Sequence, residues 1–190
     1  MTRDSKIPTV PANGSASAVL TYELQGVASV DKAAVLLGEA PNHVARVPVA
    51  AGGTAVTLEP VPLTLSGSAS ASSLRLTLRS GVIRWDLPDW SEELGADTEV
   101  MTITYDVTYT AGFTGGHAFT GDNVALRLPD GKIVDPRADG HSQSIELIAA
   151  HQTKTGLFSR FEIPSGTKGK VSVIVRNGED SGRVSFTVPG

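Results

Sequence analysis

The chain has 190 residues, an ordinary length for one all-β domain with a sizeable core. Its hydrophobic content of 40% and its formal net charge of only −4 exclude the composition of a disordered chain, and this acidic balance lacks the footprint of a nucleic-acid binder. The absence of cysteine excludes disulfides, zinc–thiolate sites and thiol nucleophiles, and it fits both an exported bacterial domain and a cytosolic one.

The first seventeen residues predict a flexible tail. They are rich in Pro, Gly, Ser, Asn and Ala, and they offer too little apolar surface to offset the entropy of ordering them. Residues 1–10 lack the apolar region of a secretory signal, and no apolar run approaches the roughly 18 residues that span a bilayer. We therefore expect a tail over residues 1–17, a single β-sandwich domain over residues 18–190, and no transmembrane segment.

Few segments before residue 98 depart from a strand pattern. Residues 31–37 are too short to decide between helix and strand, and residues 91–94 favour one helical turn after Pro88. Residues 66–73 are almost wholly Ser, Ala and Gly, which predicts an exposed loop rather than a linker between domains. We therefore expect little helix.

The segment from Leu74 to Leu87 alternates apolar and polar side chains, which is the period of a β-strand. Gly81 interrupts the alternation, so the segment is either a bent strand or a hairpin. Trp85 keeps the register of the apolar Ile83, and we expect its ring to pack in the core.

The clearest strand covers residues 98–110. Large apolar and aromatic side chains alternate there with polar ones, which predicts one dry face. The side chains expected on that face are Met101, Ile103, Tyr105, Val107 and Tyr109.

Two hairpins are predicted after that strand. Pro129-Asp130-Gly131 should reverse the chain, because proline fixes φ and glycine tolerates positive φ. The last hairpin should close the core, with alternating apolar side chains on both sides of a polar connection over residues 177–182. The apolar residues of this closing hairpin are Val171, Val173, Val175, Val184, Phe186 and Val188.

The order of these features resembles a known domain family. A strand rich in Thr and Val is followed by Asn123–Gly131, by Phe161–Gly166 and by a closing Gly182–Pro189 segment. Over residues 98–190 this order is similar to telokin-like, immunoprotective-extracellular-type Ig-like domains of bacteria. The resemblance implies an all-β, antiparallel immunoglobulin-like β-sandwich with little helix, at the cell envelope or outside the cell, without catalytic residues. The chain carries no signal peptide or lipid-anchor cysteine, so export would require that a leader had been removed.

Motifs that identify enzymes are missing from the sequence. It contains no Gly-x-Ser-x-Gly elbow, no His-Glu-x-x-His pair, and neither of the common glycine-rich phosphate and dinucleotide turns. Residues 166–170 lack the spacing of a phosphate loop and predict a turn between strands. The basic residues are dispersed without interleaved aromatics. We therefore expect a non-enzymatic protein without a cofactor or a nucleic-acid partner.

One loop carries a candidate cation site. Asp135, Asp139 and His141 lie close together in the sequence, and hard oxygen ligands suit calcium, although Arg137 adds opposing charge. The favoured interpretation is a structural loop. The alternative is an enzyme or metal-binding protein whose site assembles from separated loops around these residues, with His117 as a further candidate.

Trp90 is the candidate recognition residue. It follows a Pro-Asp turn and precedes three polar residues, so we expect partial exposure and a role in a partner surface. Together these features favour a non-catalytic binding or structural module of the bacterial cell envelope or exterior. Such a module would contact a protein or glycan through loops or a sheet edge, and the sequence does not determine its oligomeric state.

Overall fold

A computed structural model gives the structure of most of the chain. It describes residues 17, 19, 21, 33–39, 43–55, 59–85, 94–95, 97–138 and 145–190. The chain divides into two compact units, one made of residues 1–36 and 46–55 and the other of residues 37–45 and 56–190. Strands dominate the described residues, whose one helical element is the short 3₁₀ turn Gly121–Asn123. The prediction of an all-β chain with little helix is confirmed.

A separate two-stranded sheet precedes the main body of the chain. Its strands are β1 (Ala34–Glu39) and β2 (His43–Pro48). From Ala34 onward, the segment that the sequence left undecided is therefore a strand. All of the predicted tail over residues 1–17 except its last residue, and most of the predicted helical turn over residues 91–94, lie outside the described residues. The single domain over residues 18–190 stays a prediction.

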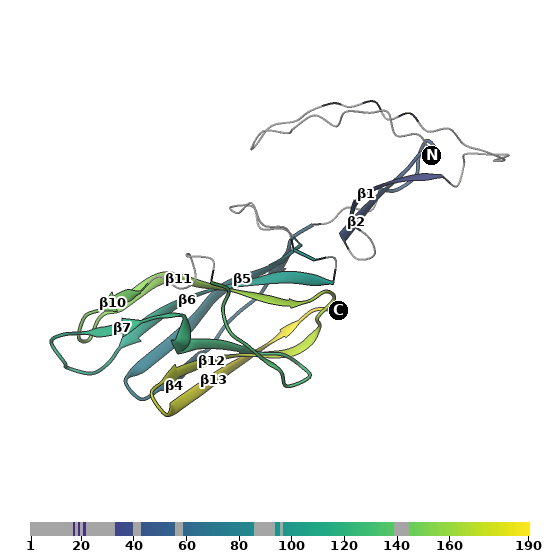
Figure 1. Cartoon of the computed structure of the whole chain (residues 1–190). Coiled ribbons are helices and arrows are strands. Elements are labelled where there is room, and N and C mark those ends of the chain that lie inside the picture. The colour runs from purple at the N-terminus through teal and green to yellow at the C-terminus, as the bar shows by residue number, and fades with distance from the viewer. Residues whose placement is uncertain are drawn as a thin grey trace. The chain divides into compact units, whose positions relative to one another are not determined.

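Two antiparallel sheets form the body of the larger unit, and Figure 1 shows them as two layers. The first has the strand order β11-β6-β5-β3, with β4 also paired to β5. Its strands are β3 (Val61–Leu63), β4 (Ser68–Ala71), β5 (Leu74–Arg84), β6 (Thr98–Tyr109) and β11 (Thr153–Pro164).

The second sheet has the order β13-β12-β8-β9. Its strands are β8 (Val124–Arg127), β9 (Ile133–Val134), β12 (Gly169–Asn177) and β13 (Asp180–Val188). A small additional pair joins β7 (His117–Phe119) to β10 (Glu146–Ile148). Buried side chains from both large sheets form one hydrophobic cluster, so the body is an antiparallel β-sandwich.

The predicted dry face of β6 is confirmed. All five side chains expected there are buried, and they belong to the cluster between the two sheets. Tyr105 buries its ring, and its hydroxyl forms a 2.7 Å hydrogen bond with the hydroxyl of Ser159 on β11. Burial of a tyrosine in an apolar layer requires such a partner, because an unsatisfied hydroxyl is costly.

The strand β5 decides the choice between a bent strand and a hairpin. It runs without reversal, and its pairing with β6 shifts register between Leu78 and Ser80, which marks a bulge. Ile83 is buried as expected, but the prediction for Trp85 is wrong: the residue is 37% exposed. The strand ends at Arg84, so Trp85 follows the last residue that the sheet holds in register.

Both predicted hairpins are present. In the first, Gly131 has a φ of 90° and donates its N–H to the carbonyl of Leu128, so β8 and β9 pair across a tight turn. In the closing hairpin the two strands extend further than predicted. Asn177 and Asp180 pair in register, which leaves two residues in the turn.

Half of the loop predicted over residues 66–73 is a strand instead, namely β4. Ala69 and Ala71 on β4 are buried, and β4 pairs with β5. The small side chains permit a close approach to β13. A Cβ atom placed on Gly182 would lie 2.1 Å from the carbonyl oxygen of Ser70. Local composition predicts a loop, but this tertiary contact favours a strand.

Candidate functional site

The outer face of the second sheet carries basic side chains on three neighbouring strands. Arg127 lies on β8, Lys170 on β12 and Arg183 on β13, and all three are exposed. They point outward because their neighbours in sequence, such as Leu126 and Val171, are buried in the sandwich and side chains alternate along a strand. We call this surface the cationic face.

The register of the strands places two arginines on opposite sides of β12. Ser172 pairs with both Arg127 and Ser185, and the next outward residue of β12, Ile174, pairs with Arg183. The hydroxyls of Ser172 and Ser185 are 2.9 Å apart and hydrogen-bonded. A polar floor therefore lies beside the two guanidinium groups.

None of the three basic side chains forms an ion pair with a residue that the structure describes. A fourth arginine of the same sheet, Arg176, differs, because its Nη1 lies 3.1 Å from Oδ1 of Asp135. Like charges that form no ion pair raise the local positive potential, even in a chain whose net charge is −4. The cationic face is therefore suited to bind an anion.

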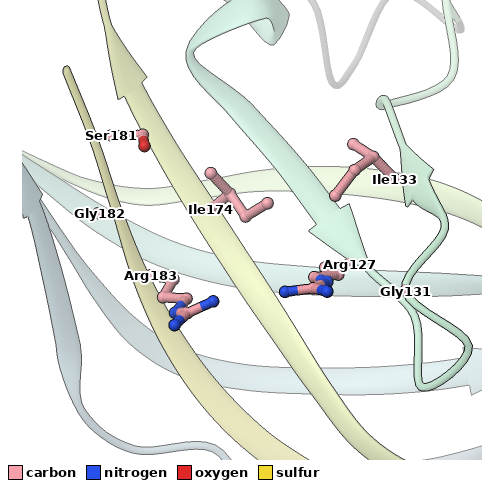
Figure 2. Close-up of a pocket in the computed structure, with 7 residues that line it drawn as sticks. All are labelled: Arg127, Gly131, Ile133, Ile174, Ser181, Gly182 and Arg183. Carbon is pink, nitrogen blue, oxygen red and sulfur yellow. The ribbon is translucent and has the colours of Figure 1, made fainter.

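Two shallow hollows lie on the cationic face and share three of their lining residues, which are Arg127, Gly131 and Arg183. One has a volume of about 500 Å³ and also contacts Ile133 and Ile174, as Figure 2 shows. The other, of about 280 Å³, also contacts Lys170 and both serines of the polar floor. Because they share a boundary, we treat them as one groove with an apolar part and a polar part.

The chemistry of this groove is recognition of an anionic group. Arginine presents five N–H donors in a planar fork and stays charged, so it can hold a carboxylate, sulfate or phosphate through two parallel hydrogen bonds. Lys170 adds a mobile ammonium group. The serine hydroxyls can donate to a further oxygen of the same ligand.

The candidate residues of the cation loop do not come together among the described residues. Asp139 and His141, like Trp90, lie outside the described residues. Asp135 is exposed and pairs with Arg176. Across the described part of the chain, no group of three or more His, Asp or Glu side chains is placed to hold a metal ion.

His117 has a structural setting of its own. Its ring lies 5.5 Å from that of Tyr109, and its Nε2 is buried without a hydrogen-bond partner among the described residues. Burial lowers the pKa of His117 below its usual range, which favours the neutral ring. The ring of His117 therefore packs against that of Tyr109.

In the sequence, the basic residues Arg127, Lys170 and Arg183 are dispersed. Only the pairing of the strands shows that they lie on one face. Each of the three occupies a polar position in a strand with period two. The predicted closing hairpin is enough to place Lys170 and Arg183 on the same face, because an antiparallel register puts the outward residues of both strands on one side of the sheet. Arg127 joins them through pairing between β8 and β12, which no local pattern specifies.

Comparisons of this chain with protein-family models, with curated proteins and with solved structures found no match. The described residues contain no helix of the length and apolar character needed to cross a membrane. The fold and the site describe this protein as an all-β antiparallel sandwich with a cationic groove on one sheet.

Proposed function

We propose that this chain is a non-catalytic binding or structural module of the bacterial cell envelope or exterior whose cationic face contacts an anionic region of a protein or glycan. The observation that carries the proposal is the gathering of Arg127, Lys170 and Arg183, none of which has an ion-pair partner in the part of the chain that the structure describes. The immunoglobulin-like assignment and the location follow from the resemblance of residues 98–190.

The electrostatics of the groove support this function. Exposed cations steer an acidic partner toward the groove and set its orientation, and their effect weakens as salt screens them. Their position on strands rather than long loops keeps the spacing of the charges fixed, as a recognition surface requires. The sequence pointed to loops or a sheet edge as the contact, and the proposal now places it on a sheet face.

The function is tested with charge reversal. Arg127→Glu should weaken binding of fluorescent poly-glutamate and of dextran sulfate at least about tenfold, or ~1.4 kcal/mol, at low salt. Arg75→Glu is the matched control, because Arg75 is exposed on the other sheet and the change in net charge is the same. Thermal unfolding of each variant checks that the fold is kept.

Equal losses in the two variants would mean that only net charge matters, and the cationic face would then not be a site. Binding that persists unchanged in Arg127→Glu and in Arg183→Glu would exclude the proposed function.

A further inference from the structure

The groove has an apolar part, and this part narrows the class of ligand. Ile174 lies on the strand between Arg127 and Arg183, and Ile133 is 43% exposed on the neighbouring edge strand β9. Figure 2 shows both isoleucines and both arginines among the residues that line the larger hollow. A ligand that fills the groove must therefore cover aliphatic surface as well as neutralise charge.

Among the described residues, none that lines the groove has an aromatic side chain. Single-stranded nucleic acids bind by stacking bases on aromatic rings, and sugar rings pack on similar flat surfaces. Aliphatic side chains match the branched, apolar side chains of a peptide instead. Charge and apolar surface together favour a protein segment over a glycan.

The strand register gives the spacing of the two arginines. Arg127 and Arg183 lie on the two strands that flank β12. Arg127 pairs with Ser172 and Arg183 with Ile174, which is the next outward residue along β12. Strands are about 4.8 Å apart and outward residues about 7 Å apart, so the two Cα atoms are separated by about 12 Å. In an extended peptide, side chains four residues apart point the same way and span about 13 Å.

We infer that the cationic face binds an extended acidic segment of a partner protein, with two carboxylates four residues apart and an apolar side chain midway between them. Each carboxylate pairs with one arginine, and the apolar side chain covers Ile174. The inference rests on the proposed function and specifies its partner.

The test uses short peptides against the full chain. A fluorescent peptide with the pattern Glu-Ser-Leu-Ser-Glu is compared with Glu-Ser-Ser-Ser-Glu and with Glu-Ser-Glu-Ser-Leu, all flanked by glycines, and with dextran sulfate. The first peptide should bind at least tenfold more tightly than the other two. Ile174→Thr should remove most of the advantage of leucine over serine, and Arg183→Glu should weaken every anion.

The outcomes separate the inference from the proposed function. If the three peptides bind alike, or dextran sulfate binds far more tightly through the same arginines, the groove recognises anions without the predicted peptide pattern and the inference is wrong. If no anion responds to Arg127→Glu or Arg183→Glu, both the inference and the function fail. Ile133→Thr, at a more exposed side chain, repeats the apolar test should Ile174→Thr unfold.

Discussion

Arg79 and Asp106 form a hydrogen-bonded ion pair across two strands of the first sheet. Arg79 donates from Nε and Nη2 to Oδ2 of Asp106 at 2.7 Å and 2.5 Å, while Oδ1 accepts from the backbone N–H of Gly156 at 3.0 Å. The strands on both sides of Asp106 are irregular here, at residues 78–80 and 154–157. The buried carboxylate of Asp106 on β6 therefore forms hydrogen bonds with residues at or beside the irregularities of both neighbouring strands.

This arrangement predicts an acid-sensitive contribution to stability. The hydrogen bonds from Arg79 hold the pKa of Asp106 below its usual range. The contribution is fully present above the unfolded-state pKa, near 3.9, and is lost as pH falls through the lower folded-state pKa. Asp106→Asn should therefore cost about 2 kcal/mol at neutral pH, and the difference from the wild type should shrink in acid.

Urea unfolding across this pH range measures the effect. Glu179→Gln, at an exposed turn residue, is the control and should leave the wild-type profile unchanged. A constant difference at every pH would show that the charge of Asp106 does not matter.

The buried pair Tyr105 and Ser159 predicts a strong coupling. Burial raises the pKa of Tyr105 to about 12, and its hydroxyl has Ser159 as partner. Tyr105→Phe or Ser159→Ala alone should cost about 1–3 kcal/mol because each leaves one buried hydroxyl unsatisfied, whereas the double variant should cost less than the sum. Chemical denaturation of the four proteins checks this, and strict additivity would contradict it.

The contrast between Phe186 and Trp85 tests the assignment of the core. Phe186 is buried and pairs with Val171 in the closing hairpin, so Phe186→Ala should cost about 3–5 kcal/mol. Trp85 lies past the end of β5, and Trp85→Ala should cost less than about 1.5 kcal/mol. A similarly large loss of unfolding free energy in both variants would show that Trp85 is a core residue.

The close approach of β4 to β13 makes Gly182 intolerant of a side chain. A Cβ atom there would meet the carbonyl oxygen of Ser70, which belongs to the backbone and cannot move aside alone. We expect Gly182→Ala to lower stability by about 1–3 kcal/mol. Gly95→Ala is the control, since its Cβ would have no contact closer than 3.8 Å. Equal melting temperatures would show that the strands separate freely.

The sequence predicts the sandwich because its evidence is local. The alternation around Tyr105 and the turn at Gly131 each lie within a few residues, and the structure confirms both. The predicted burial of Trp85 was wrong because periodicity does not show where a strand ends. The strand β4 was predicted as a loop because its small side chains are typical of loops. Its contact with Gly182 on β13 is visible only in the folded chain. The recognition role predicted for Trp90 stays a prediction.

The candidate site depends on pairing between segments far apart in sequence. Lys170 and Arg183 can be placed on one face from the closing hairpin alone. Arg127 reaches that face only because β8 pairs with β12, and Asp135 neutralises Arg176 only once both strands are in place. Charge gathered in this way cannot be read from composition.

Residue-resolved mapping of an anion on the folded protein tests the binding site most directly. Two-dimensional NMR of the isotope-labelled chain, titrated with poly-glutamate, reports which backbone amides respond. Shifts should cluster at residues 127–131, 170–174 and 183–185, and they should disappear in the Arg127→Glu/Arg183→Glu double variant. Shifts that centre on β6 and β11 of the opposite sheet, or that survive the double variant, would contradict a cationic binding face on the second sheet.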